Sequence, residues 1–283
     1  MTSVSTENVN IGYNKRIIVK DFSVEIPENK VTAIIGANGS GKSTLLKAIT
    51  RIIPFESGNI LIDGKQINEE NTKDLAKKIA ILPQSPDSAQ GLTVGELVSY
   101  GRFPYQNSFG RLSKTDYEMV NWALEMTGIT DFKYRNVDTL SGGQRQRVWI
   151  AMALAQDTEI IFLDEPTTYL DMAHQLEVLE LLEKLNREQG RTIIMVLHDL
   201  NQAARFADHI IALKKGEIVK TGACEEVITK AVLREVFHVD AVIGKDPRTQ
   251  KPLCLTYNLW RGEKEHDAEK FSVDAFARAA AYR

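Results

Sequence analysis

The chain has 283 residues, of which 43% are hydrophobic and 26% charged, a composition typical of a folded protein with a large core. Its net charge of −3 argues against a broad nucleic-acid-binding surface, and we expect no nucleic-acid partner. Cys224 and Cys254 show neither metal-ligand spacing nor a disulfide framework, which fits a reduced, cytoplasmic setting. The polar N-terminus lacks the apolar core of a signal peptide, and no apolar run reaches the roughly 18–20 residues of a membrane-spanning helix. If the chain serves transport, we expect the pore to be another polypeptide.

The first third of the chain alternates strand patterns with turn signals. Residues 4–11 and 16–26 alternate apolar and polar side chains, as paired antiparallel strands do. Asp63-Gly64 is a strong hairpin-turn signal between strands at 58–62 and 65–67. The other elements expected here are a buried strand over 31–35, a helix over 42–51, a short helix over 74–78 and a short buried strand over 79–82.

From about residue 87 to residue 156 the pattern becomes helical, with periodic segments over 93–102, 114–127 and 142–156. Strands and helices alternate beyond it, which predicts a largely parallel sheet with the helical block inserted as a subdomain. The elements expected in this part are strands over 159–164 and 191–197, helices over 172–189 and 200–207, and a hairpin of 209–213 with 217–221. After residue 239 the signal weakens, leaving 241–243 and 253–257 as candidate edge strands and 267–282 as a candidate surface helix.

A phosphate-binding loop is the most informative motif. It follows the pattern G-x-x-x-x-G-K-[ST] between an apolar strand and a helix, the context that this motif requires, and reads Gly36-Ala37-Asn38-Gly39-Ser40-Gly41-Lys42-Ser43. Glycines let backbone N–H groups close around phosphate oxygens, and the helix N-terminus adds its dipole. We expect Lys42 to reach the β- and γ-phosphates and Ser43 to ligate Mg²⁺, so that the chain binds ATP or GTP. The alternative is a Gly-rich turn that happens to precede a helix.

More polar groups follow strands of the same expected sheet. The strand over 160–164 delivers Asp164 and Glu165 at its carboxyl end, where ligands of open α/β sheets bind. Asp164 is placed to hold the Mg²⁺ shell and Glu165 to deprotonate an attacking water, although an acidic pair after a strand is also a common helix cap. His198 could stabilise transition-state charge, but a lone histidine is more often structural. Gln84 follows the strand over 79–82, and its amide oxygen could reach Mg²⁺ or the water.

A second anion site is predicted far from the phosphate loop, at Leu140-Ser141-Gly142-Gly143-Gln144. Ser141 is a good helix N-cap, and Gly142 and Gly143 permit close backbone approach where the next helix starts. A two-fold dimer explains two phosphate sites in one chain, because each loop's ATP would be covered by the partner's copy of this segment. The alternative is a capped helix with a Gly-rich entry.

Taken together, these residues resemble the ATP-binding-cassette (ABC) ATPases over about residues 4–240. Gly36–Ser43 resembles the Walker A loop, 160–164 the Walker B strand, and Leu140–Gln144 the signature pentapeptide. The resemblance implies ATP and Mg²⁺ as ligands, with Thr44 also at the nucleotide. It further implies these roles: Glu165 as catalytic base, Gln84 as the Q-loop glutamine, His198 as the switch histidine, Tyr13 as an aromatic residue that stacks on adenine, and Asp171 as the aspartate of the D-loop 169–171, which communicates across the dimer.

The same resemblance implies a fold and a domain division. The fold is an α/β P-loop NTPase cassette with a mixed sheet, an antiparallel β subdomain and an inserted α-helical subdomain at about 87–156. Residues 1–240 would form the ATPase domain, and 241–283 a C-terminal extension.

A narrower resemblance is to the ATPase subunits of iron–siderophore importers. It is visible in Leu82-Pro83-Gln84, 93–98, Tyr100-Gly101-Arg102, Pro104-Tyr105, 166–171 and His174-Gln175. It implies a homodimer that lies peripherally on the cytoplasmic face of the membrane and energises a separate permease, which it contacts through about Gln84–Arg111. An external substrate-binding protein would be an indirect partner. Vitamin B12 and haem importers are close relatives, and a soluble cassette ATPase of iron–sulfur cluster assembly is a further alternative. The aromatics Tyr100, Phe103, Tyr105 and Phe109 are candidates either for the docking surface or for the core of the helical subdomain.

Overall fold

The computed structural model describes residues 2–14, 16–84, 89–106, 111–168 and 170–261. A six-stranded sheet lies at its centre, formed by β3 (Val31–Gly36), β6 (Ile79–Leu82), β7 (Ile160–Asp164), β8 (Thr192–Val196), β9 (His209–Lys214) and β10 (Glu217–Gly222). The strand order is β10-β9-β3-β8-β7-β6, with β10 antiparallel to β9 and the other neighbours parallel. Every residue of β3, β7 and β8 is buried, because both faces of the parallel part are covered.

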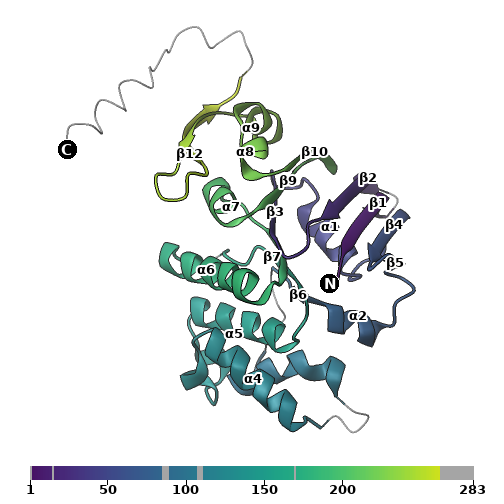
Figure 1. Cartoon of the computed structure of the whole chain (residues 1–283), viewed down its shortest axis with the longest axis vertical. Coiled ribbons are helices and arrows are strands. Elements are labelled where there is room, and N and C mark those ends of the chain that lie inside the picture. The colour runs from purple at the N-terminus through teal and green to yellow at the C-terminus, as the bar shows by residue number, and fades with distance from the viewer. Residues whose placement is uncertain (1, 15, 85–88, 107–110, 169, 262–283) are drawn as a thin grey trace, which may run out of the picture.

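A second, antiparallel sheet covers one face of the central sheet (Figure 1). It contains β1 (Val4–Tyr13), β2 (Arg16–Ile26), β4 (Ser57–Ile62) and β5 (Lys65–Gln66), in the order β2-β1-β4-β5. Helix α1 (Lys42–Ile49) packs between the two sheets. Its residues Leu45, Leu46 and Ile49 belong to one buried cluster. That cluster also contains Ile34 and Val196 of the central sheet and residues of strands β1, β2 and β4. The phosphate loop therefore leads into a helix that is held on both sides.

The helical block lies at one end of the molecule, between β6 and β7 in the chain (Figure 1). It contains α3 (Val94–Ser99), α4 (Lys114–Met126), α5 (Gly142–Ala155) and the 3₁₀ helices η1 (Tyr100–Tyr105), η2 (Thr130–Phe132) and η3 (Val137–Thr139). The helix expected over 93–102 was too long, because α geometry ends at Ser99 and a 3₁₀ turn containing Pro104 replaces it. Helix α2 (Thr72–Lys78) begins two residues earlier than expected, since Asn71 caps it.

The remaining elements complete the side of the central sheet that faces the helical block and extend the opposite end of the molecule (Figure 1). They are α6 (Met172–Gln189), α7 (Leu200–Phe206), α8 (Cys224–Val227), α9 (Lys230–Phe237), β11 (Val239–Lys245) and β12 (Pro252–Leu259). The predicted edge strands are confirmed as the antiparallel pair β11–β12, which is longer than expected. Helices α8 and α9 were not predicted from the sequence, and the helix expected over 267–282 lies outside the described residues.

These layers confirm the predicted fold class, with a mixed sheet, an antiparallel β subdomain and an inserted helical subdomain. The division at residue 240 stays a prediction. In the structure, Ala241 and Cys254 of the β11–β12 pair share a buried cluster with Leu233 of α9. Among the described residues, no helix combines the length and the hydropathy that crossing a membrane requires.

A buried ion pair joins two elements of the helical block. Arg102 Nε donates to Asp116 Oδ1 at 2.8 Å, and its Nη1 donates to the carbonyl oxygen of Ala155 at 2.7 Å. Asp116 also accepts from the backbone N–H of Ser113 at 2.8 Å, as the acidic partner of a capping box. Burial alone would raise the pKa of Asp116, but the hydrogen bonds from Ser113 and the pairing with Arg102 outweigh it and hold the pKa below its usual value.

We expect Asp116→Asn to lower the free energy of unfolding by about 3 kcal/mol at pH 7, because it leaves a buried guanidinium without its counter-charge. The pKa of Asp116 is lower in the folded chain than in the unfolded chain. The ionised carboxylate therefore stabilises the fold fully at pH values above the unfolded-state pKa, and this contribution is lost as the pH falls through the folded-state pKa. Chemical denaturation at a series of pH values should therefore show the gap between wild type and variant closing below about pH 4. The control Glu118→Gln breaks the exposed Lys114–Glu118 pair of the same helix and should cost less than about 0.5 kcal/mol. Equal costs for the two variants would contradict this account.

Candidate active site

Four polar segments meet at the carboxyl edge of the central sheet. The phosphate loop follows β3, His198 follows β8, Glu165 follows β7 and Gln84 follows β6, and these strands are consecutive in the sheet. They border a cleft of about 680 Å³, whose walls are residues 38, 39 and 41–44 together with Gln84, Glu165, Thr168 and His198. The cleft thus brings together residues that lie far apart in the sequence, and all of them except Thr168 were predicted from the sequence.

The phosphate loop offers uncapped backbone donors at the start of α1. Gly39 and Gly41 have φ values of 76° and 101°, which side chains of L-residues rarely tolerate. Gly41 is the N-cap of α1, and in the described part of the chain no side chain caps this helix and its first turn holds no acidic residue. The N–H groups of the first turn and the positive end of the helix dipole are therefore available to an anion such as phosphate.

Lys42 lies within this loop and is only 5% exposed. Its ammonium group donates to the carbonyl oxygen of Gly36 at 2.9 Å and to that of Ala37 at 3.1 Å. Burial lowers the pKa of Lys42, while the nearby carboxylates of Glu165 and Asp164 oppose that shift. A buried cation whose hydrogen-bond acceptors are neutral carbonyls is well suited to receive a phosphate, because an anionic partner would offset its desolvation.

Ser43 and Asp164 form the pair that the sequence predicts for Mg²⁺. Ser43 Oγ donates to Asp164 Oδ1 at 2.9 Å, although the two residues are far apart in the chain. Burial raises the pKa of Asp164, and Glu165 adds to this, whereas Ser43 and Lys42 act in the opposite direction. A hydroxyl and a carboxylate beside a phosphate loop are the oxygen donors that Mg²⁺ uses at nucleotide sites, so the residues present fit this ion. In the described residues, no group of three or more His, Cys, Asp and Glu side chains suggests another metal site.

Glu165 is the most constrained residue of the cleft. Its φ of 56° lies in the left-handed region, which is uncommon for a residue other than glycine and often marks a functional position. Its carboxylate accepts from Gln84 Nε2 at 2.6 Å and from Thr168 Oγ1 at 3.0 Å, and it forms an ion-pair contact with His198 Nε2 at 2.5 Å. Burial would raise the pKa of Glu165, but these partners, His198 first, outweigh it and lower the pKa.

These contacts refine two sequence predictions. The amide of Gln84 contacts Glu165, so its role as a metal ligand stays a prediction. Thr168 was not predicted as a site residue, although it lies in segment 166–171, which carries part of the importer resemblance. Its hydroxyl can contact Glu165 because residues 165–168 form a turn closed by the Thr168 N–H and the Glu165 carbonyl at 3.2 Å.

The other predicted residues do not line the cleft of their own chain. Tyr13 ends β1 and is 43% exposed, and Asp171 is the N-cap of α6. Ser141 is the N-cap of α5 and forms a capping box with Gln144, so the capped-helix interpretation is correct as a local description. Segment 141–144 lies outside the cleft, as expected if it serves a second copy, and its contact with ATP stays a prediction.

Comparisons with known proteins agree with this geometry. The sequence profile of the ABC transporter family matches residues 19–168. The chain is 58% identical over 265 residues to the iron(3+)-hydroxamate import ATP-binding protein FhuC of Bacillus subtilis, covering 94% of this chain and 98% of the relative. It is 48% identical over 257 residues to the achromobactin transport ATP-binding protein CbrD of Dickeya dadantii, covering 91% and 96%.

Solved structures agree as well. A putative metal-chelate type ABC transporter in an inward-facing conformation superposes with a TM-score of 0.77 at 28% identity, covering 91% of this chain and 97% of that one. The ATP-binding cassette MJ0796, solved as a dimer in a post-hydrolysis state with ADP and Pi, superposes with a TM-score of 0.68 at 34% identity, covering 78% and 98%. The chain therefore belongs to the ABC transporter family, as one of its ATP-binding, ATP-hydrolysing subunits.

Proposed function

We propose that this chain energises the import of ferric siderophores, as a pair of copies on the cytoplasmic face of a separate membrane permease that receives cargo from an external binding protein. The observation that carries the proposal is the 58% identity, over nearly the whole chain, to the iron(3+)-hydroxamate import ATP-binding protein. The cleft supports it, because a phosphate loop, a hydroxyl–carboxylate pair and a restrained glutamate are the groups that ATP hydrolysis requires.

ATP binding uses the loop and the cation already placed in it. The β- and γ-phosphates would occupy the start of α1, and the Lys42 ammonium would exchange the carbonyls of Gly36 and Ala37 for phosphate oxygens. Tyr13 would stack on adenine at the edge of the site. Ser43 and Asp164 would hold Mg²⁺, which when bound supplies positive charge to the phosphate oxygens.

Hydrolysis requires a base that is ionised and aimed at a water. The lowered pKa of Glu165 keeps its carboxylate charged at neutral pH, and its contacts with Gln84, Thr168 and His198 fix its orientation. Glu165 would accept a proton from the attacking water while His198 and Lys42 stabilise charge on the transferring phosphoryl group.

Closure of the site would come from a second copy. Segment 141–144 of a partner would cover the cleft and offer the N-terminus of its α5 to the γ-phosphate. Asp171 and its neighbour Met172, which is 77% exposed, would lie in the same contact. The pair of copies would then have two states. The γ-phosphate of bound ATP would favour the joined state, and hydrolysis would let the copies separate.

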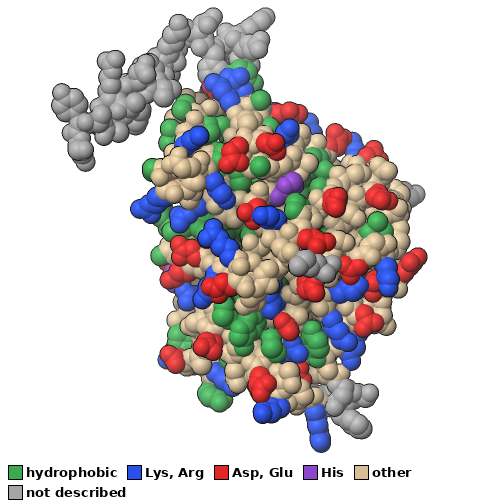
Figure 2. All heavy atoms as spheres, viewed as in Figure 1, with side chains coloured by type: hydrophobic (Ala, Val, Ile, Leu, Met, Phe, Trp, Pro, Cys, Tyr) green, Lys and Arg blue, Asp and Glu red, His purple; other side chains and the backbone are tan. Residues whose placement is uncertain are grey.

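The exposed aromatics of η1 are the proposed permease contact. Tyr100, Phe103 and Tyr105 are 40%, 55% and 36% exposed, and the first two stack with ring centroids 4.8 Å apart. This exposure favours the docking alternative over the core alternative for these three residues, while Phe109 lies outside the described residues. Figure 2 shows hydrophobic side chains gathered over the helices in the lower half of the view, with charged side chains of both signs around and among them. An exposed aromatic pair is suited to anchor another protein.

The test is uptake of radiolabelled ferric siderophores by iron-starved cells in which this chain is the sole copy of the subunit. We expect Glu165→Gln to abolish uptake, and Phe103→Ser to reduce it about tenfold while the ATPase rate of the isolated subunit stays within about twofold. The control Tyr134→Ser removes an aromatic side chain that is 85% exposed in the same helical block and should leave uptake unchanged.

Each other outcome identifies what is wrong. Siderophore uptake that survives Glu165→Gln would remove this cargo from the proposal, and loss of vitamin B12 or haem uptake instead would name the cargo of a related importer. A pull-down of Glu165→Gln with ATP in mild detergent that recovers only soluble partners would favour a protein-assembly ATPase. Equal effects of Phe103→Ser and Tyr134→Ser would reject η1 as the docking surface.

A further inference from the structure

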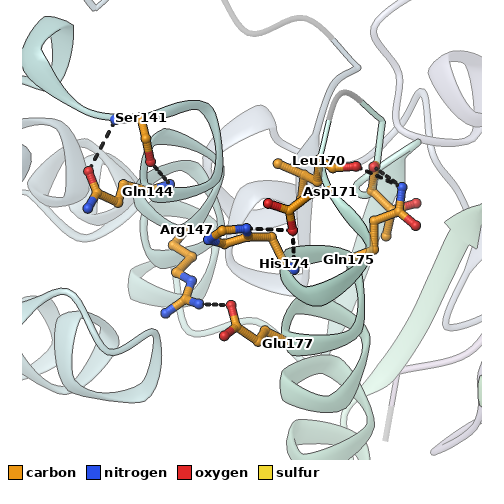
Figure 3. Close-up of polar contacts among 9 residues, drawn as sticks. Ser141, Gln144, Arg147, Leu170, Asp171, His174, Gln175 and Glu177 are labelled. Atoms are coloured by element: carbon orange, nitrogen blue, oxygen red, sulfur yellow. Dashed lines mark hydrogen bonds and ion pairs between the residues drawn. The ribbon is translucent and has the colours of Figure 1, made fainter.

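The start of α6 links the segment expected to cover a partner's ATP to the helix that comes after His198. Two adjacent residues make the links, His174 and Gln175, which we call the α6 clamp. Figure 3 shows both side chains at the start of α6, with His174 on the side of α5 and Gln175 on the side of Leu170. Neither residue lines the ATP cleft, so the mechanism above does not use them.

His174 holds two predicted site residues at once. Its backbone N–H donates to Asp171 Oδ1 at 3.0 Å, and its ring Nδ1 lies 2.8 Å from the same oxygen. The ring also packs against Gly143, where an added Cβ would lie 2.8 Å from His174 Cδ2, whereas a Cβ on Gly142 would meet nothing within 4 Å. The imidazole therefore fixes the distance between Asp171 and the signature glycine.

Two further contacts join α5 to Pro166 and to α6, beside the contact that His174 makes. Gln146 Nε2 donates to the carbonyl oxygen of Pro166 at 3.0 Å, and Arg147 forms an ion pair with Glu177 (Figure 3). These contacts set the register of α5 on α6, and His174 lies at the end of α5 that carries the signature residues.

Gln175 connects in the opposite direction. Its Nε2 donates to the carbonyl oxygens of Leu170 at 3.0 Å and Thr167 at 3.3 Å, which ties both residues to the start of α6 (Figure 3). Its Oε1 accepts from Gln202 Nε2 at 2.7 Å. Gln202 belongs to the first turn of α7, whose N-cap Asp199 directly follows His198.

We propose that His174 and Gln175 are positioning residues that transmit the state of the chain's own ATP cleft, through α7 and through their contacts with Thr167, Leu170 and Asp171, to the signature segment that covers the partner's ATP. This inference rests on the proposed two-copy function. The two groups of residues it joins serve different ATP molecules, so a rigid link between them would make closure of one cleft favour closure of the other. Its loss should weaken association of the copies while each phosphate loop keeps its own affinity.

The test uses Glu165→Gln as the parent, so that hydrolysis does not separate the copies. Sedimentation equilibrium with saturating ATP measures dimerisation, and titration of dilute protein with a fluorescent ATP analogue measures binding by single subunits. We expect His174→Ala and Gln175→Ala each to raise the dimer dissociation constant about tenfold while the nucleotide affinity stays within about twofold. His174→Asn, whose amide can still donate to Asp171, should recover dimerisation to within roughly threefold of the parent. The control Arg187→Ala breaks an exposed ion pair later in the same helix and should change neither quantity.

The outcomes separate this inference from the proposed function. A parent that stays monomeric with ATP would reject the two-copy mechanism and the clamp with it. A parent that dimerises no better than its His174→Ala and Gln175→Ala variants would reject the clamp alone. A parallel loss of nucleotide affinity and of thermal stability in the variants, without recovery in His174→Asn, would also overturn it, because the two residues would then be merely structural.

Discussion

Replacing Glu165 with glutamine should lower the steady-state rate of ATP hydrolysis by about 10²- to 10⁴-fold, the usual contribution of a general base. The substitution is nearly isosteric, and the amide can still contact Thr168 and His198, so the phosphate loop should keep its shape. The amide cannot accept a proton from water at neutral pH. ATP should therefore bind with close to wild-type affinity and hold the copies together, since the step that would release them is blocked.

Phosphate release and nucleotide binding, measured on the same preparation, check this expectation. The matched control is Glu159→Gln, which removes an exposed carboxylate next to the other end of β7 and should leave both quantities unchanged. Hydrolysis at the wild-type rate in Glu165→Gln would show that the base is another group. A joint loss of binding and turnover would show that Glu165 holds the nucleotide rather than activating water.

Removal of the Lys42 ammonium should reduce ATP affinity by about 100-fold or more. Charged hydrogen bonds contribute roughly 1.5–3 kcal/mol each, and Lys42 is placed to donate two of them to the phosphates in place of Gly36 and Ala37. Lys42→Ala should have a smaller effect on folding, because the burial of the ammonium opposes its hydrogen bonds in the nucleotide-free chain.

Calorimetric titration with ATP measures the affinity, and thermal unfolding in the absence of nucleotide measures the stability. Lys30→Ala is the control, because it removes an exposed lysine that precedes β3, at the other end of the strand from the phosphate loop. Unimpaired ATP binding by Lys42→Ala would overturn the assignment of the phosphate loop. Equal loss in Lys30→Ala would indicate a general effect of charge instead.

The cleft could be predicted in large part because its residues stand at fixed places in the chain pattern. The phosphate loop, Asp164 and His198 each lie at or just beyond the end of a strongly apolar strand, and parallel strands bring their carboxyl ends to one edge of the sheet. The hairpin at Asp63-Gly64 could also be predicted from the sequence, because a two-residue turn sets the register of the two strands that it joins. Helix α8 was missed because its four residues form barely one turn, which is too short for a periodic pattern. Helix α9 was missed although its sequence carries a helical signal, since its buried residues Val232, Leu233 and Val236 lie at helical spacing after the N-cap Thr229.

The sequence by itself determined the fold class, the phosphate loop and the order of the polar groups around it, because strand periodicity and glycine positions act over short distances. Only the tertiary structure decided that Thr168 and Gln84 both contact Glu165, that Tyr100 and Phe103 are exposed, and that His174 packs on Gly143. These facts depend on side chains that meet across elements far apart in the chain. No local pattern encodes such a meeting, since it arises only when the helical block, α6 and the central sheet pack into one core.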